Sequence, residues 1–525
     1  MKEYAIIPRP LSVQYGSSFF TCSGLPQIAA RDAVQGVTQG AAQGCAVFQK
    51  EADIFTGQIR QTWGENTSSF ARINLVKTDG KASAPSAGIS ADESYRLEIT
   101  PEGMTLAAPS PAGAYRGLQT LRQIFLSEYQ NGGLSIHSGV IEDRPRFPWR
   151  GFMLDCSRYF YTPAFIKKLL DALSLQHINV FHWHLSDDQG WRLPVASYPL
   201  LTEIGSKRRE HRLSGEFSGG FYTEAEIREI VSFAAERHIE VVPEIDLPGH
   251  ASAVLAAYPG LGCTGGPYRV EDRFGIFEDV LCAGNEGIFA LVGAVFDTLA
   301  ELFPSRYVHI GGDEVLYTRW AECPKCRKRL AELGLDNPAQ LQGWITARFA
   351  RMLKERGKTA IGWDEVLENT EKFPLPEDLI VMSWRGQEGG NRATAMGRRV
   401  IMTPQTNGCY LDHRPIEDPD EPGRLGVGTV AQAYAMDPVT PEMSAAAASL
   451  VLGGQGNLWS EVIYSGRIAE YMIFPRICAI AEALWSERRP GLKEGEDLAD
   501  FSKRLAIHQR RLDKLNLLQY RGPLE

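Results

Sequence analysis

Residues Arg306–Glu314 read RYVHIGGDE, and the rest of the chain is interpreted outward from this stretch. Apolar and β-branched residues lead into it, as in a buried strand. Side chains on a regular strand alternate between faces, so Asp313 and Glu314 would point opposite ways unless the backbone bends. Gly311 and Gly312 allow that bend. Two close carboxylates push each other's pKa values apart, which suits acid/base chemistry, whereas most Asp–Glu pairs on surfaces are simply solvated.

The sequence around this stretch predicts a parallel barrel. Strand-length apolar runs recur after the first 150 residues, separated by stretches with helical periodicity. The predicted strands are Gly151–Asp155, Asn179–His184, Ile239–Ile245, Tyr307–Ile310, Thr359–Trp363, Leu379–Trp384, Arg399–Met402 and Leu450–Gly454. Eight such units predict a closed (β/α)8 TIM barrel. An open doubly wound sheet is the alternative, but it would often carry a Gly-rich phosphate loop after its first strand, and that loop is absent from the sequence.

A smaller α/β domain is predicted to precede the barrel. We expect residues 1–142 to form this domain and residues 146–525 to form the barrel, joined by the charged, proline-containing segment Glu142–Arg150. Within the first domain we predict a hairpin, a helix and a mobile loop, at Glu93–Ile99 with Met104–Ala107, at Gly113–Ser127 and at Lys81–Ala91. This domain shows no catalytic constellation, so a structural or docking role is expected.

The composition and charge of the chain limit the kinds of partner that it is expected to bind. The chain of 525 residues is 44% hydrophobic and 23% charged, as in ordinary soluble proteins. Its net charge of −9 argues against a nucleic-acid partner. Its sequence has no apolar run near the ~20 residues that a membrane span needs. Residues 1–7 do not resemble a secretory signal, so the chain as written is expected to be cytoplasmic, or periplasmic or secreted if a leader was removed. The sequence does not define an oligomeric state.

The cysteines do not form a disulfide framework, because there are nine of them, scattered along the chain. Cys323 and Cys326 lie in a Cys-Pro-Lys-Cys segment, which has the spacing of a metal knuckle. A structural zinc site needs four ligands, and the sequence has no second pair with that spacing. A small structural turn is the interpretation that the sequence favours over zinc.

Barrel enzymes place their chemistry at the C-terminal ends of the strands. Three of the predicted strand ends carry a tryptophan, at Trp363, Trp384 and Trp459. A barrel core favours branched aliphatic residues, so tryptophan at three rim positions suggests an aromatic-walled pocket rather than core packing. Aromatic walls suit the apolar faces of a sugar, and charged residues among them suit its hydroxyl groups. The strand ends therefore predict a carbohydrate site.

Two other classes of protein stay open on the residues alone. His182 and His184 are two positions apart on one strand and could bind a metal together with His250 and His309, as in a metal-dependent hydrolase. Each could equally be a hydrogen-bonded core histidine. A sugar-binding protein without catalysis is the third class. The adjacent carboxylates at the end of the fourth strand favour an enzyme.

Several long motifs, in order, resemble family 20 glycoside hydrolases, the β-N-acetylhexosaminidases. The motifs are DCSRY at Asp155–Tyr159, HLSDDQGWR at His184–Arg192, EIDLPGH at Glu244–His250, HIGGDE at His309–Glu314, GWDE at Gly362–Glu365, YLD at Tyr410–Asp412 and NLWSE at Asn457–Glu461. The resemblance covers roughly residues 90–490 and extends to IPRP at Ile7–Pro10, which is similar to the start of the family's small first domain. It implies the barrel fold and exo-acting, retaining hydrolysis of terminal β-linked N-acetylhexosamine.

The resemblance also implies substrate-assisted catalysis, in which the substrate's own acetamido oxygen attacks the anomeric carbon to form an oxazolinium ion. Glu314 would be the general acid and then the general base, which requires a raised pKa. Asp313 would be ionised and would accept the acetamido N–H. Tyr410 would donate a hydrogen bond to the acetamido oxygen.

The remaining implied roles concern binding and tuning. The three rim tryptophans would enclose the acetyl methyl group. The residues implied to hold the sugar hydroxyls are Arg158, Asp412 and Glu461. Asp246 and His250 are implied to form a dyad that tunes Glu314. Asp187 is implied to belong to the same surroundings. Metal ions and organic cofactors are not expected to be needed. The partner is a small-molecule or oligosaccharide substrate, and the choice between GlcNAc and GalNAc, which differ at C4, stays open.

Overall fold

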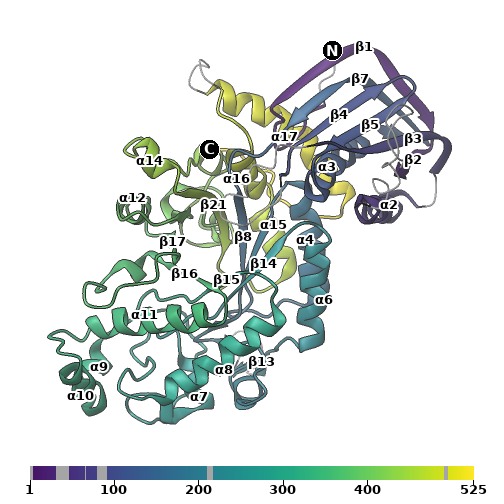
Figure 1. Ribbon diagram of the computed structural model, residues 1–525. Helices are drawn as coiled ribbons and strands as arrows, with labels where there is room; N and C mark the ends of the chain where they lie inside the picture. Colours follow the sequence, from purple (N-terminus) through teal and green to yellow (C-terminus); the bar gives the residue numbers. More distant parts are fainter. Residues whose placement is uncertain (1–3, 31–46, 65–66, 80–91, 210–216, 490–494) are drawn as a thin grey trace.

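The computed structural model describes residues 4–30, 47–64, 67–79, 92–209, 217–489 and 495–525. Figure 1 shows a twisted sheet near the N-terminus packed beside a larger barrel with helices around it. The mobile loop predicted at Lys81–Ala91 lies outside the described residues.

The described part of the first domain is a sheet with two helices. Its strands are β1 (Ser12–Ser23), β2 (Leu25–Ala30), β3 (Thr67–Lys77), β4 (Tyr95–Thr100), β5 (Gly103–Ala108), β6 (Tyr129–Gln130) and β7 (Gly133–Asp143), and its helices are α2 (Gln49–Trp63) and α3 (Pro111–Glu128). The sheet has the order β1-β7-β4-β5-β3-β2, with β6 on β7. Strands β4 and β5 are antiparallel, which confirms the predicted hairpin. Burial alternates along both strands, because one face packs on α3.

The second domain is a closed barrel of parallel strands, as predicted. Its strands are β8 (Trp149–Asp155), β9 (Val180–His184), β14 (Glu240–Glu244), β15 (Tyr307–His309), β16 (Thr359–Trp363), β17 (Ile380–Ser383), β18 (Val400–Met402) and β21 (Val451–Leu458). Each overlaps a predicted strand. The last one extends further than predicted, because β21 continues to Leu458 alongside β8.

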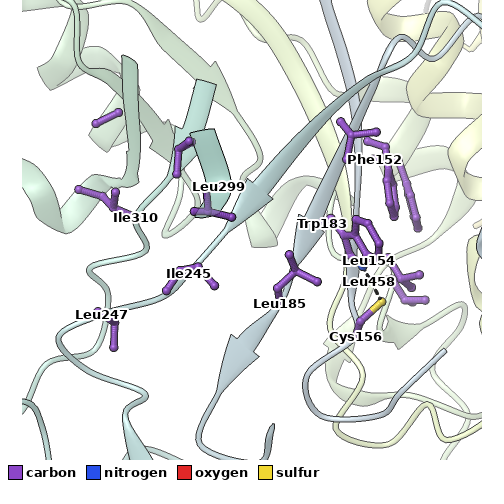
Figure 2. Packing of buried hydrophobic residues seen from close by; sticks show 14 of the residues in the cluster. Phe152, Leu154, Cys156, Trp183, Leu185, Ile245, Leu247, Leu299, Ile310 and Leu458 are labelled. Carbon is purple, nitrogen blue, oxygen red and sulfur yellow. Dashed lines mark hydrogen bonds between the residues drawn. The ribbon is translucent and has the colours of Figure 1, made fainter. Parts of the chain in front are cut away.

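Helices lie between the barrel strands and after the last of them. The principal ones are α4 (Pro163–Leu175), α6 (Glu224–Ala235), α8 (Gly287–Leu302), α11 (Gln340–Glu355), α12 (Glu388–Ala395), α13 (Val430–Ala435), α15 (Gly466–Ile473), α16 (Arg476–Trp485) and α17 (Glu496–Lys514). Their starts follow known signals: Thr162 caps α4 ahead of Pro163, and Thr223 with Glu226 forms a capping box on α6. Figure 2 shows part of the buried layer, where Leu154 and Leu458 lie beside Trp183.

Buried ion pairs join the two domains. Glu93, just before β4, accepts hydrogen bonds from Arg116 on α3 (2.8 Å) and from Arg150 on β8 (2.7 Å). All three side chains are almost fully buried. Helix α3 also packs on α4 and α17, so residues from both ends of the chain meet at the junction (Figure 1).

Helices long and apolar enough to cross a membrane are absent from the part of the chain that the structure describes.

Candidate active site

The backbone bends sharply after β15, where the sequence predicted it. Gly311, Gly312 and Glu314 have φ of 65°, 96° and 52°, in the left-handed region. A Cβ atom on Gly311 would lie 1.7 Å from Oδ1 of Asp246, so only glycine fits there. The same Oδ1 accepts the N–H of Gly312 at 3.0 Å. Asp246, which follows β14, therefore shapes the turn that presents Asp313 and Glu314.

Asp313 is buried and holds an unused acceptor. Its Oδ1 has no hydrogen-bond partner among the described residues. Burial raises the pKa of Asp313 well above its usual value, and the negative charge of Asp246 raises it further. An acidic side chain with a vacant, buried oxygen is suited to accept an N–H from a ligand.

Glu314 lies closer to solvent, with 32% of its side chain exposed. Its Oε2 lies 3.5 Å from Nε2 of His250. Burial raises the pKa of Glu314, but the hydrogen bond and positive charge of His250 outweigh burial, so its pKa falls below the usual value. The expectation of a raised pKa at Glu314 is therefore wrong for the free protein. The two neighbouring carboxyls do differ in pKa, with the proton favoured on Asp313.

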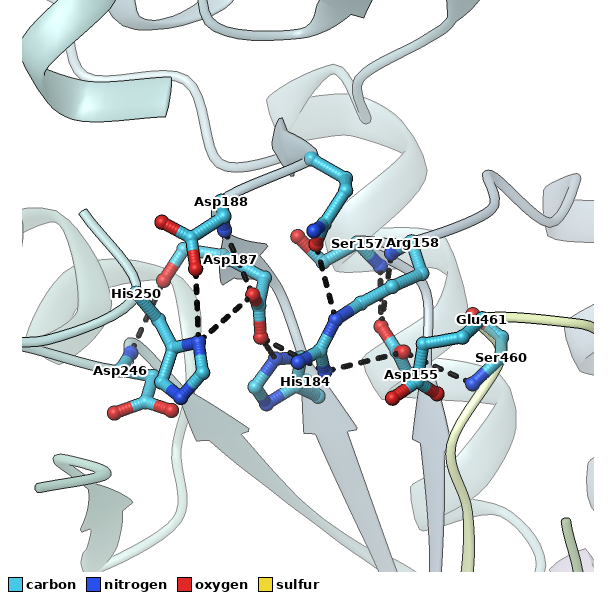
Figure 3. Close-up of polar contacts among 12 residues, drawn as sticks. Asp155, Ser157, Arg158, His184, Asp187, Asp188, Asp246, His250, Ser460 and Glu461 are labelled. Carbon is cyan, nitrogen blue, oxygen red and sulfur yellow. Dashed lines mark hydrogen bonds and ion pairs between the residues drawn. The ribbon is translucent and has the colours of Figure 1, made fainter. Parts of the chain in front are cut away.

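His250 connects these acids to a pair of aspartates after β9. Its Nδ1 lies 3.0 Å from Asp188 and 3.2 Å from Asp187 (Figure 3). Although burial opposes it, the charge of Asp187 raises the pKa of His250 well above its usual value, so the imidazole carries a proton. The sequence paired His250 with Asp246. In the structure, Asp188 and Asp187 contact its ring directly, and Asp246 lies within 4.8 Å of it and accepts the N–H of Gly312.

Arg158 lies on the other side of Asp187, as Figure 3 shows. Its Nη1 is 2.8 Å from Asp187, and its Nε donates to Gln189 at 3.1 Å. The guanidinium also lies over the ring of Trp459, 5.0 Å from its centroid. Asp155 at the end of β8 accepts the N–H of Arg158 at 3.0 Å. Arg158 is thus held firmly at the strand ends, as a residue that positions a ligand should be.

The aromatic residues predicted at the rim lie together. Trp363 and Trp459 have ring centroids 5.8 Å apart, and Trp384 stacks on Tyr410 at 6.3 Å. Tyr410 and Trp459 are 6.4 Å apart, which joins the two pairs. Burial raises the pKa of Tyr410 well above its usual value, so its hydroxyl keeps the proton it can donate.

A second group of buried carboxylates holds vacant oxygens. Oδ1 of Asp412 and Oε2 of Glu461 have no hydrogen-bond partner within the described part of the chain. Their other oxygens are 2.6 and 2.7 Å from Arg424, which the sequence reasoning missed. Arg424 lies on β20 (Arg424–Val427), in a rim loop whose fold the sequence does not reveal. The arrangement suits the hydroxyl groups of a sugar.

Two other residues were missed although their motifs were recognised. Asp188 lies in the HLSDDQGWR motif and accepts from His250. Glu365 lies in the GWDE motif and accepts the indole N–H of Trp384 at 2.9 Å. Burial and the charge of Asp313 raise the pKa of Glu365 to about 9. Asp188 follows the predicted Asp187, and Glu365 lies two residues after the predicted Trp363, so the signal was the motif itself.

The histidines predicted as alternative metal ligands are divided between two places. His182, His184 and His309 surround Glu244 inside the barrel, at 3.0, 2.6 and 2.9 Å. The second oxygen of Glu244 also accepts the indole N–H of Trp363 at 2.9 Å. His250 instead faces Asp313 and Glu314. His184 is hydrogen-bonded to Glu244, and His182 and His309 lie within ion-pair distance of the same carboxylate. A shared buried carboxylate favours the alternative of core histidines.

The fold and site together define a class, that of TIM-barrel proteins with adjacent acids after the fourth barrel strand. Two family models match nearly the whole chain: glycosyl hydrolase family 20, domain 2, over residues 3–144, and the catalytic domain of the same family over residues 147–488. The chain therefore belongs to glycosyl hydrolase family 20.

Curated relatives carry consistent names. A β-hexosaminidase of Porphyromonas gingivalis is 40% identical over 439 residues, covering 82% of this chain and 55% of that protein. The chain therefore spans about half the length of this relative. A β-N-acetylhexosaminidase of Cellulomonas fimi is 31% identical over 538 residues, covering 100% and 97%.

The fold of this chain is similar to solved structures over almost its full length. The exo β-N-acetylglucosaminidase of Vibrio harveyi in complex with N-acetylglucosamine is 28% identical with a TM-score of 0.83, over 99% of this chain and 78% of that chain. A mutant β-hexosaminidase of Streptomyces plicatus in complex with GlcNAc is 28% identical with a TM-score of 0.81, over 100% and 98%.

Proposed function

We propose that this chain is an exo-acting, retaining β-N-acetylhexosaminidase that removes terminal, non-reducing β-linked GlcNAc or GalNAc. The observation that carries the proposal is the vacant, buried Oδ1 of Asp313 next to Glu314. Adjacent residues are poorly placed to flank a sugar ring as acid and nucleophile, which stand ~5–5.5 Å apart across the ring in ordinary retaining enzymes. A nucleophile supplied by the substrate removes that requirement.

In the proposed reaction, the acetamido N–H donates to Oδ1 of Asp313, and Tyr410 donates to the acetamido oxygen. That oxygen attacks the anomeric carbon while Glu314 gives its proton to the leaving oxygen and the glycosidic bond breaks. The resulting oxazolinium ion is opened by water, whose proton Glu314 takes back. Asp313 stabilises the positive charge that develops on the acetamido group.

Substrate binding must also move the proton preference from Asp313 to Glu314. In the free protein, the pKa of Asp313 is raised and that of Glu314 is lowered. A hydrogen bond from the acetamido N–H favours ionised Asp313, and a sugar that covers Glu314 disfavours its charge. Both effects act in the direction that the reaction needs, so the ligand itself would set the protonation of the pair.

Binding of the sugar is assigned to the remaining residues. Arg158, Asp412 and Glu461 would hold the hydroxyl groups, with Arg424 paired to both acids. Trp363, Trp384 and Trp459 would enclose the acetyl methyl group. The absence of the acetamido group should therefore remove both the nucleophile and a large part of the binding energy.

The test is a paired initial-rate assay on an aryl β-N-acetylglucosaminide and the matching aryl β-glucoside. Rapid release from the first with essentially none from the second is expected. Comparable rates would require a nucleophile on the protein and would overturn the mechanism. No release from either, with N-acetylglucosamine still bound, would indicate a binding protein. The matching β-N-acetylgalactosaminide then measures tolerance at C4.

A further inference from the structure

Four cysteines come together outside the site already described. Cys323 and Cys326 bracket the start of α10 (Pro324–Glu332), and Cys263 and Cys282 come from the loop between η3 (Pro259–Leu261) and α8. Their sulfur atoms all lie within 4.8 Å of one another. The sequence reasoning found only the first pair, because Cys263 and Cys282 are far from it and from each other along the chain.

The spacing of the sulfurs has the size of a metal tetrahedron. Cys282 lies 3.8 Å from Cys323 and 3.6 Å from Cys326, and Cys263 lies 3.8 Å from Cys326. Zinc binds thiolates at ~2.3 Å, which places the sulfurs of a tetrahedral site ~3.8 Å apart. A disulfide would require ~2.05 Å. A cluster of several irons would hold its cysteines farther apart, so the space suits a single ion.

The surroundings of the four cysteines favour a negatively charged group. Cys282, Cys323 and Cys326 are buried, and Cys263 is half-buried. A zinc ion with four thiolates has a net charge of −2, and the N-terminus of α10 contributes partial positive charge. Its first turns carry basic residues and no acid, although acids are usual at this end of a helix: Lys325, Arg327, Lys328 and Arg329.

The backbone also makes room for the cluster. A Cβ atom on Gly284 would lie 2.2 Å from the carbonyl carbon of Lys325, so only glycine lets the Cys282 loop approach α10 this closely. Trp320 on α9 (Thr318–Glu322) donates to the carbonyl of Leu281 at 2.9 Å, and Arg319 pairs with Asp279 at 2.7 Å. The two segments are therefore docked on both sides of the cysteines.

We propose that Cys263, Cys282, Cys323 and Cys326 bind one structural zinc ion. The thiols lose their protons as the metal binds. The ion clamps the loop after β14 to the segment after β15. The first loop carries His250, and the N–H of Leu281 donates to the carbonyl of Pro248 at 3.0 Å. The second segment follows directly from Asp313 and Glu314. In Figure 1, α9 and α10 lie together on the side of the barrel away from the first domain, and α7 (Ser252–Ala257) lies on the same side.

The first experiment uses the unmodified protein, purified without added chelator from zinc-supplemented cells. Elemental analysis should give about one zinc per chain. X-ray absorption at the zinc edge should show four sulfurs at about 2.3 Å. Titration with an organomercurial, which reacts with thiolates, should release that zinc to a coloured chelator as the four cysteines react. Disulfides by intact mass, iron in place of zinc, or zinc with nitrogen or oxygen ligands would each overturn the proposal.

Matched variants locate the ion. Cys282→Ser and Cys326→Ser should lower the bound zinc to below about a fifth of an equivalent and lower the Tm. Cys22→Ser and Cys409→Ser, at cysteines outside the cluster, should keep it. Full zinc content in both cluster variants would overturn the proposal. If they fail to fold, the organomercurial titration of the unmodified protein decides the matter. The aryl glycoside assay is separate, so the zinc site and the proposed activity can fail independently.

Discussion

Two buried carboxylates in this protein have opposite surroundings. Glu93, at the junction of the domains, is held by Arg116 and Arg150 at 2.8 and 2.7 Å. Burial raises the pKa of Glu93, but the charges of Arg150 and Arg116 outweigh it and lower the pKa overall. Asp313 has Asp246 as a neighbour and a vacant oxygen, and its pKa is raised. The first carboxylate is paired within the fold, and the second keeps one oxygen without a partner among the described residues.

The different surroundings of Glu93 and Asp313 predict that one residue matters for stability and the other for function. A buried charge is tolerated when it is paired, and removing one partner exposes the cost of burying the other. A buried acceptor without a partner costs free energy in the free protein and is expected where a ligand binds. Substitution at Glu93 should therefore affect folding, and substitution at Asp313 or Glu314 should affect turnover. The predictions below test that separation.

The largest effect is expected for Glu314→Gln, which removes the proton donor without changing size. The rate with an alkyl leaving group should fall by roughly 10²–10⁴-fold, the usual contribution of general acid–base catalysis. With a nitrophenyl leaving group, which departs without a proton, the loss in the first step should be smaller. Kinetics with both substrates measure this ratio. Equal losses for the two leaving groups would contradict the role of acid.

Glu93→Gln tests the other half of the comparison. Arg116 and Arg150 would be left buried without their counter-charge, so the free energy of unfolding should fall by roughly 3–5 kcal/mol. Denaturant unfolding measures this, and kcat of the folded protein should stay unchanged. The matched control is Glu98→Gln on β4, whose exposed pair with Arg96 at 2.8 Å should contribute at most about 1 kcal/mol. Equal destabilisation by the two variants would show that the buried pairing is not decisive.

Asp313→Asn should show the reverse pattern. The rate should fall by roughly 10²-fold, because a neutral amide stabilises the developing positive charge less well. The unfolding midpoint should be unchanged or higher, because the amide removes a buried acid whose ionised form is disfavoured. Unfolding and the aryl glycoside assay are measured on the same sample. A clear loss of stability would mean that Asp313 has a structural partner like that of Glu93.

The sequence predicted the barrel well because its signal is local and repeated. Each predicted strand overlaps one of the observed strands, and Gly311 and Gly312 marked the bend correctly. Parallel strands bring their C-terminal ends to one face, so Trp363 and Trp459 could be placed together from strand order alone.

Contacts between side chains on different loops could not be predicted in this way. Arg424 joins Asp412 and Glu461 through a rim loop whose path has no periodic pattern. Cys263 and Cys282 meet Cys326 only because the loops after β14 and β15 pack together. The lowered pKa of Glu314 depends on the position of His250, which adopts a left-handed φ of 45° that the sequence does not indicate.

His250 provides the subtlest test, because it lowers the pKa values of both Glu314 and Asp313. The dependence of kcat/KM on pH reports the free enzyme. The active form of the Asp313–Glu314 pair carries one proton. The rate should therefore fall at low pH, where Glu314 gains a proton while Asp313 keeps its own, and at high pH, where the pair loses its last proton. His250→Asn removes a positive charge, so both pKa values rise and the whole profile should move to higher pH by about one unit.

The control for this shift is Asp188→Asn. It removes a partner 3.0 Å from Nδ1 but keeps the imidazole, which stays charged because Asp187 remains 3.2 Å away, so the upward shift seen with His250→Asn should be absent. A uniform loss of rate in His250→Asn with both limbs unmoved would mean that His250 only supports the local structure. Movement to lower pH would contradict the charge on its ring. Either result would weaken the contrast with Glu93, because the pKa values of Asp313 and Glu314 would then be determined by something other than their nearest charged neighbour.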